Sequence, residues 1–246
     1  MVRIIPVGLR ALLVEVTEPA HTAALAADLH RWRDRGELAG VRDVVPGELT
    51  VLLDGLDDPA ALAGRLAGWR PSSSRPPDGP LVEVPVRYDG ADLAEVARHW
   101  RVTEEEVRRI HSAPEYRVAF CGFAPGFGYL TGLPERYHLP RRAVPRTRVP
   151  AGSVALAGGY AGIYPRDSPG GWQLLGCTDL VLFDPDRDPV ALLTPGTRVR
   201  FRDVDVDDGR GGGDDGRGGI AGVDEDAGGR PGARARHDAG RGESPA

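Results

Sequence analysis

The chain has 246 residues, of which 41% are hydrophobic, and a formal net charge of −5. This length suffices for one large domain or two small ones with a packed core. Residues 203–246 hold eleven acidic residues and six arginines, so residues 1–202 are electrically neutral. A neutral body with an acidic end lacks the basic surface that nucleic acid requires, and we expect no nucleic-acid partner.

The absence of lysine and the small number of cysteines exclude several further types of catalytic and structural chemistry. The chain contains arginine but no lysine, which excludes a lysine Schiff base and a biotinylated lysine on this chain. The only two cysteines, Cys121 and Cys177, are too few for a disulfide framework and favour a cytoplasmic location. Glycine, proline and arginine interrupt the first apolar run, and no run reaches about 18 residues, so we expect neither signal peptide nor membrane span.

Residues 1–70 are expected to form a small α+β sandwich, with both helices on one face of a mostly antiparallel sheet. The order is β-β-α-β-β-α. Leu25, Leu29 and Trp32 recur at helical spacing, and Asp58 stands before Pro59 as the cap of a second helix. The expected strands are 4–7, 11–16, 41–45 and 48–53, and the expected helices are 22–35 and 59–69.

A Pro/Ser-rich stretch at 71–80 predicts a linker, and a second domain is expected at 81–202. It opens with an alternating strand at 81–87, followed by two short helices. Asp92 with Glu95, and Thr103 with Glu106, have the spacing of capping boxes. Many short strands between turns then predict a barrel or a sandwich. These strands are expected at 117–121, 153–157, 173–176, 180–183, 190–193 and 198–201.

Residues 203–246 contain glycine, aspartate, arginine and alanine with almost no large apolar side chain. Such a segment cannot bury enough surface to offset its ordering entropy, so we expect a disordered tail. No cysteine and histidine cluster has zinc spacing, and we predict no metal site; nor is there a P-loop or a dinucleotide fingerprint.

The stretch from Tyr116 to Thr178 is the most informative part of the chain. Glycines and prolines punctuate it every few residues, aromatic side chains stand between them, and five arginines share the same loops. Dense turn residues beside aromatic anchors are typical of ordered loops, and ordered loops on a scaffold often carry binding or catalysis. A β-barrel with many tight turns is the alternative explanation.

Three blocks of this stretch closely resemble one family: GFAPGFGYL at 122–130, PRRAVPRTRVPAGSVALAGG at 140–159 and IYPRDSPGGWQLLGCT at 163–178. The family comprises the first subunit of allophanate hydrolase, the 5-oxoprolinase B subunit and KipI-like proteins. The resemblance extends more weakly over about 4–201. It implies that the second domain is a cyclophilin-like β-barrel of the carboxyltransferase type, so the expected fold is an α+β sandwich followed by a mainly β barrel.

The resemblance implies a component of an ATP-dependent 5-oxoprolinase, which opens 5-oxo-L-proline to L-glutamate by phosphorylating the lactam oxygen and then admitting water. The A and C subunits of 5-oxoprolinase are the implied partners, the substrate is a small molecule, and this chain alone is expected to be inactive. Two alternatives stay open: a KipI-like inhibitor of a sensor histidine kinase, and an allophanate hydrolase or urea amidolyase component. Leu9 and Thr197 stand where the family often has aspartate, and Cys177 where it often has a polar residue.

The candidate catalytic residues are His111 and Arg146. A histidine before the glycine-rich loops can act as a general base near neutral pH, although a helix-terminal structural role is the alternative. The guanidinium groups of Arg141 and Arg146 suit a phosphate or a substrate carboxylate, with pairing to Glu135 or Asp167 as the alternative. Arg142 and Arg148 are expected to be solvated or paired at the surface.

The remaining candidates bind substrate. Ser168, Gly170 and Gly171 lie in a rigid SPGGW turn whose amides can surround an anion, and Trp172 either plugs the core or floors a pocket. Phe123, Phe127 and Tyr129 of the first block complete the set. The cysteines are expected to be buried and inert.

Overall fold

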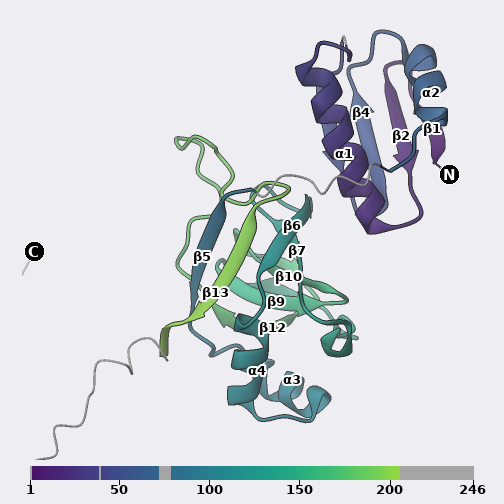
Figure 1. Cartoon of the computed structure of the whole chain (residues 1–246). Helices are drawn as coiled ribbons and strands as arrows, with labels where there is room; N and C mark the ends of the chain where they lie inside the picture. Colours follow the sequence, from purple (N-terminus) through teal and green to yellow (C-terminus); the bar gives the residue numbers. More distant parts are fainter. Residues whose placement is uncertain (1, 39, 72–78, 206–246) are drawn as a thin grey trace, which may run out of the picture. The chain divides into compact units, whose positions relative to one another are not determined.

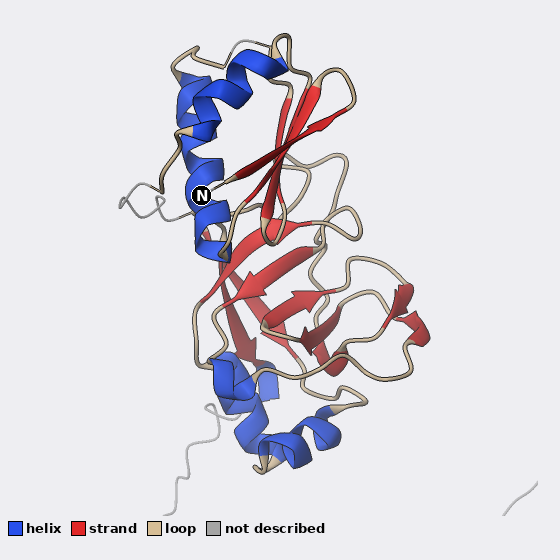
Figure 2. Cartoon of the chain, turned by 90° about the vertical axis from the view of Figure 1, so that its right-hand side faces the viewer, coloured by secondary structure: helices blue, strands red, loops and turns tan. Residues whose placement is uncertain are grey.

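The structure is a computed structural model that describes residues 2–38, 40–71 and 79–205. Residues 2–71 contain a four-stranded antiparallel sheet of order β1-β2-β4-β3, with two helices on one face (Figure 2). The expected β-β-α-β-β-α order and the α+β class are confirmed. The elements are β1 (Arg3–Val7), β2 (Ala11–Glu15), α1 (Pro19–Asp34), β3 (Asp43–Pro46), β4 (Thr50–Asp54) and α2 (Pro59–Ala67).

Local chemistry explains both helices. Helix α1 begins at a proline, whose fixed φ suits the first helical turn, and its Leu25 and Leu29 are fully buried. Asp58 caps α2 as expected, because its side chain accepts the Ala61 N–H at 3.0 Å. Trp69 follows α2 and donates its indole N–H to the buried Asp28 of α1 at 2.8 Å, which ties the two helices together.

Residues 79–205 form a seven-stranded sheet that curls into a nearly closed barrel, with order β12-β9-β10-β7-β6-β13-β5 (Figure 1). The mainly β barrel is therefore confirmed. Its strands are β5 (Leu81–Val86), β6 (Tyr116–Cys121), β7 (Gly128–Thr131), β9 (Ser153–Ala157), β10 (Tyr160–Ile163), β12 (Gln173–Cys177) and β13 (Arg198–Asp203). The barrel also carries helices α3 (Leu93–Trp100) and α4 (Glu104–Ser112), the 3₁₀ turn η1 (Glu135–Tyr137), and a separate pair β8 (Arg146–Val149) and β11 (Ser168–Gly170).

The barrel closes where the chain leaves β5. Arg87 and Cys177 exchange two backbone hydrogen bonds of 2.9 Å, which join this end to β12. Gly90 continues the closure by donating its N–H to Leu175 at 3.0 Å. Gly176 lies so close to the opposite chain that a Cβ there would overlap the Arg87 carbonyl, so the seam requires glycine.

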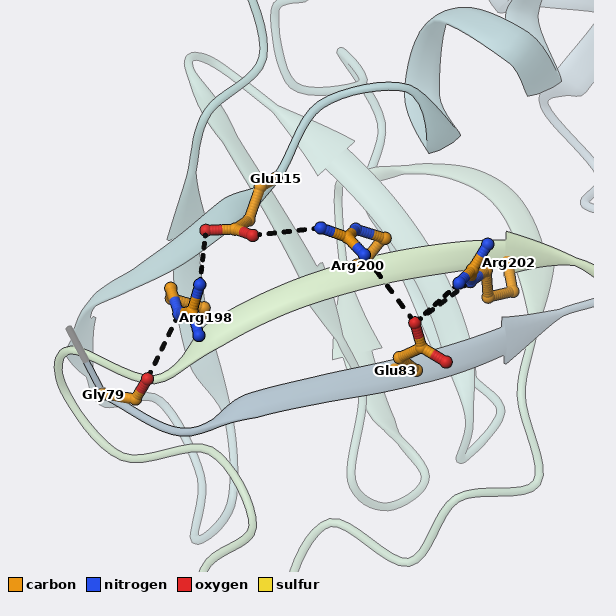
Figure 3. Close-up of polar contacts among 6 residues, drawn as sticks. All are labelled: Gly79, Glu83, Glu115, Arg198, Arg200 and Arg202. Carbon is orange, nitrogen blue, oxygen red and sulfur yellow. Dashed lines mark hydrogen bonds and ion pairs between the residues drawn. The ribbon is translucent and has the colours of Figure 1, made fainter.

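Strand β13 lies between β6 and β5 and is parallel to β5. Its three arginines, Arg198, Arg200 and Arg202, occupy every second position and so lie on one face of the strand. They form a ladder of ion pairs with two glutamates, Glu83 and Glu115 (Figure 3). Glu115 bonds Arg198 at 3.5 Å and Arg200 at 3.3 Å, and Glu83 bonds Arg202 at 2.7 Å. Partly exposed pairs of this kind each add little stability.

Two hydrophobic clusters cover the two faces of β9. Val154 and Leu156 point into the barrel interior, whereas Ala155 and Ala157 pack against an aromatic cluster on the other face. The pair β8–β11 and the 122–127 loop add Val149 and Phe127 to that second cluster. Because β9 is buried on both faces, its sequence SVALA is apolar throughout its last four residues rather than alternating.

Some expected elements are wrong. Strands at 180–183 and 190–193 are absent, and only a single bridge joins Phe183 to Ala191 within the described part of the chain. The capping box at Thr103 and Glu106 is confirmed, but Asp92 makes no cap bond to its helix. None of the helices in the described residues is long and apolar enough to cross a membrane.

The domain boundaries at 70, 80 and 202 stay a prediction, and most of the linker falls outside the described residues. So does the expected tail from residue 206 onward. Of its first residues, Asp203 ends β13, and Asp205 forms an ion pair of 2.8 Å with Arg108 of α4.

Candidate functional site

Asp92 is the centre of the candidate site. It precedes α3 and its side chain is only 2% exposed. Its backbone N–H bonds the Leu174 carbonyl at 3.0 Å, and its Oδ2 accepts the Leu174 N–H at 2.7 Å. The aspartate therefore bonds strand β12 through both backbone and side chain, which leaves Oδ1 to face residues 140–146, the arginine loop.

Two arginines converge on that second oxygen. Asp92 Oδ1 accepts from Arg142 Nη1 at 2.6 Å and from Arg146 Nη2 at 2.7 Å. Arg142 also reaches Glu95 at 3.2 Å, on the exposed side of α3. Charge-assisted bonds of this length are the strong kind, so the three side chains form one rigid unit.

Arg146 pairs with an acid, as in the structural alternative, but the acid is Asp92. Asp167 does not hold Arg146; it binds Arg148, with 2.7 Å from Nε to Oδ2. Arg148 is exposed and paired at the surface, as expected. Arg142 is not a surface residue of that kind, because its partner is the buried Asp92. Both oxygens of Asp92 bond other partners, Leu174 and the two arginines, and the expected Asp92–Glu95 capping box does not form.

The SPGGW turn lies directly against the arginine loop. Strand β11 pairs with β8, with Ser168 opposite Val149 and Gly170 opposite Arg146. In addition, the backbone N–H of Arg142 donates a hydrogen bond of 2.8 Å to the backbone carbonyl of Gly171. The structure thus brings the second and third of the recognised blocks together through their backbones.

Gly170 is required where it stands, because a Cβ there would overlap the hydroxyl of Tyr164. Burial raises the pKa of that phenol, and the nearby Arg141 and Arg146 lower it in part. Tyr164 therefore lies beside the arginines, beneath the strand that pairs with Arg146.

The aromatic candidates also gather at this end. The Phe127 ring lies 5.3 Å from Phe123, 5.0 Å from Tyr129 and 5.4 Å from Trp172, all in edge-to-face contact. Trp172 is buried, in agreement with a core role. Phe123 is 56% exposed and has a φ of +66°, a conformation that costs a non-glycine residue about 1–2 kcal/mol. An exposed ring held in a strained backbone is a recognised mark of functional loops.

A small cavity of about 130 Å³ lies between α3 and the loop at 140–143. Polar side chains that line it are Glu95, His99, Arg141, Arg142 and Gln173, whereas Arg146 does not reach it. Arg141 has no carboxylate partner among the described residues.

His111 lies elsewhere, in the core between α4 and the sheet. Its Nδ1 is 2.7 Å from the Tyr88 hydroxyl, and its ring packs 4.4 Å from Phe201. Burial lowers the pKa of His111 to about 3. The side chain is fully buried and its described contacts are with the core, not with the arginines. A general-base role stays a prediction, while this setting favours the structural alternative.

The cysteines have the properties of structural residues. Burial raises the pKa of Cys121 to about 11. Burial and Asp89 raise the pKa of Cys177, although Arg87 lies 2.8 Å from its sulfur. Because thiolates are the reactive species, raised pKa values oppose a nucleophilic role. Within 2–38, 40–71 and 79–205, no group of three histidine, cysteine or acidic side chains is placed to hold a metal ion.

Sequence reasoning missed Asp92 and Gln173 as site residues. Asp92 has the appearance of an ordinary helix cap, so only its tertiary partners reveal it. Gln173 offered a weak signal, as the one polar side chain in the buried strand QLLGC apart from its final cysteine.

The fold is a nearly closed barrel with flanking helices, in which β9 is buried on both faces. The family described as "Carboxyltransferase domain, subdomain C and D" matches residues 2–193, and the chain belongs to this family. A relative from Escherichia coli O157:H7, named as the B subunit of 5-oxoprolinase, is 44% identical over 79% of this chain and 93% of its own length. A relative of the same name from Haemophilus influenzae is 39% identical over 80% of this chain and 96% of its own length.

Solved structures agree on the fold. A crystal structure of TTHA0988 matches with a TM-score of 0.65 and 40% identity, over 80% of this chain. The chain spans only 40% of the length of that protein. The urea carboxylase of Kluyveromyces lactis matches with a TM-score of 0.62 over 84% of this chain and 22% of its own length. At 21% identity, the second likeness shows the fold alone.

Proposed function

We propose that this chain is the B subunit of an ATP-dependent 5-oxoprolinase complex, which cleaves 5-oxo-L-proline to L-glutamate. The observation that carries the proposal is the 39–48% identity to three relatives that bear this subunit's name, two of which are matched over more than nine tenths of their length. A subunit name implies partners, and we propose that the A and C subunits of 5-oxoprolinase are those partners.

The site supports a role in binding anions. Arg141 and Arg142 line a cavity, while Asp92 forms ion pairs with Arg142 and Arg146. Guanidinium groups bind carboxylates and phosphates, which are the anionic groups of this substrate and of its activated form. In this proposal the chain holds and orients substrate at these residues, and the Phe123 and SPGGW loops border the site or contact a partner.

The cavity does not fit a nucleotide. Ligand pockets usually measure roughly 300–1,000 Å³, and the cavity is about 130 Å³. The proposal therefore assigns ATP to a partner chain or to a surface that a partner completes. Because ATP would then require a partner chain, the isolated chain is expected to be inactive. A cytosolic location remains the prediction made from the cysteine content.

The deciding assay measures glutamate formed from 5-oxo-L-proline and ATP, with the full chain alone and with its co-purified partners. We expect activity only in the mixture. Arg146→Gln should lower it, since Asp92 then holds one arginine instead of two, while Arg148→Gln on the same strand should retain it. A stable complex that forms no glutamate would contradict the proposal and favour the kinase-inhibitor or allophanate alternative.

A further inference from the structure

The cavity beside α3 has an imbalance of hydrogen-bonding groups. Three buried side-chain atoms at the cavity or at the adjoining Asp92 cluster have no partner in the described residues: Nε of Arg142, Nη1 of Arg146 and Oε1 of Gln173. Gln173 lines the cavity and is only 7% exposed. Buried polar atoms are nearly always bonded, so each exception calls for an explanation.

The charges are also unbalanced. Asp92 gives one negative charge to two guanidinium groups, and Arg141 adds a third cation at the cavity wall. Glu95 is the one further acid that reaches this group within the described residues, and its side chain is 51% exposed. The cluster therefore carries a net positive charge of one before any contribution from His99. Partly buried guanidinium groups whose buried N–H groups lack acceptors are stabilised when an anion reaches them.

The unpaired hydrogen-bonding atoms and the excess positive charge together indicate which chemical groups a ligand of this cavity would carry. Arginine N–H groups require an acceptor, preferably a carboxylate, because a planar guanidinium can bond both of its oxygens. The orphaned oxygen of Gln173 requires a donor, such as an N–H. The cavity volume admits a small molecule only.

We propose that this cavity binds a small carboxylate that also carries an N–H donor, with Arg141 and Arg142 on the carboxylate and Gln173 on the N–H. The choice of probe rests on the proposed function: 5-oxo-L-proline has a lactam N–H next to the carbon that bears its carboxylate. Asp92 acts as a positioning residue, because its two short bonds hold Arg142 at the wall.

The test is calorimetric titration of the full chain with 5-oxo-L-proline, its lactone analogue without the N–H, 2-pyrrolidone without the carboxylate, and inorganic phosphate. We expect 5-oxo-L-proline to bind about tenfold more tightly than the lactone, the change that loss of one hydrogen bond produces. 2-Pyrrolidone should bind roughly 10- to 100-fold more weakly. Equal binding of the lactone, or tighter binding of phosphate, would overturn the assignment.

Two variants locate the site. Arg141→Gln should weaken 5-oxo-L-proline binding roughly 10- to 100-fold without a loss of fold, because this side chain has no ion pair among the described residues. Gln173→Leu should weaken it about tenfold while the melting temperature stays the same or rises, since an unbonded polar oxygen is removed from the interior. The matched control is Arg148→Gln, whose guanidinium pairs with Asp167. Unchanged binding in both variants would overturn the proposal.

Activity measurements on the assembled complex distinguish failure of the proposed subsite from failure of the proposed function. If the assembled complex forms glutamate and its KM for 5-oxo-L-proline is unchanged in both variants, the subsite is refuted and the function stands. If the complex forms no glutamate but the isolated chain binds with the pattern above, the subsite stands and the reaction is refuted.

Discussion

Replacing Asp92 by asparagine tests the architecture of the site. The substitution keeps the size of the side chain but removes the charge that Arg142 and Arg146 share at 2.6 and 2.7 Å. Removing one partner of a buried ion pair costs about 3–5 kcal/mol. The two guanidinium groups retain 27% and 24% exposure and can recover some hydration, which places the expected loss near the lower limit, about 3 kcal/mol.

For a chain of this length, a loss of 1 kcal/mol in unfolding free energy lowers the melting temperature by roughly 2–4 °C. Asp92→Asn should therefore lower the melting temperature by about 6–12 °C. Circular dichroism during heating measures the shift. The control is Glu95→Gln, which removes the exposed partner of the same Arg142 and should cost no more than about 1 kcal/mol. A fall of less than about 2 °C in Asp92→Asn, or equal falls in both variants, would refute the view that the buried carboxylate organises the arginine loop.

Three further predictions concern the barrel. Folding lowers the pKa of His111 from 6.5 to about 3, so its stabilising effect is complete above pH 6.5 and declines as the pH falls toward 3. The unfolding free energy, measured by denaturation with guanidinium chloride, should therefore drop by about 2 kcal/mol between pH 6.5 and 5. This pH-dependent component should vanish in His111→Gln. Gly176→Ala should cost about 1–3 kcal/mol by thermal melting because a Cβ meets the Arg87 carbonyl, whereas Gly171→Ala has room and should not. Glu83→Gln in the ion-pair ladder should change stability by less than about 1 kcal/mol, and a larger loss would show that the ladder holds β5 and β13 together.

Local sequence determined much of the fold. Apolar periodicity and caps located α1, α2 and α4, since a helix of this kind depends on side chains three and four residues apart. Strands β5, β6, β9, β12 and β13 were likewise located, because runs of apolar residues between turns suffice to indicate them. Resemblance across three motif blocks indicated the barrel and the family, whereas Asp92, Glu95 and His99 lie outside those blocks.

Tertiary structure decided the rest. Strands β7, β8, β10 and β11 are short and rich in glycine, tyrosine or arginine, so they are stable only in pairs with neighbouring strands. Asp92 has an ordinary cap sequence, and only the position of β12 and of the arginine loop makes it the shared partner of Arg142 and Arg146. Ion pairing depends on distance in space rather than in sequence, and these partners are 50 and 54 residues apart.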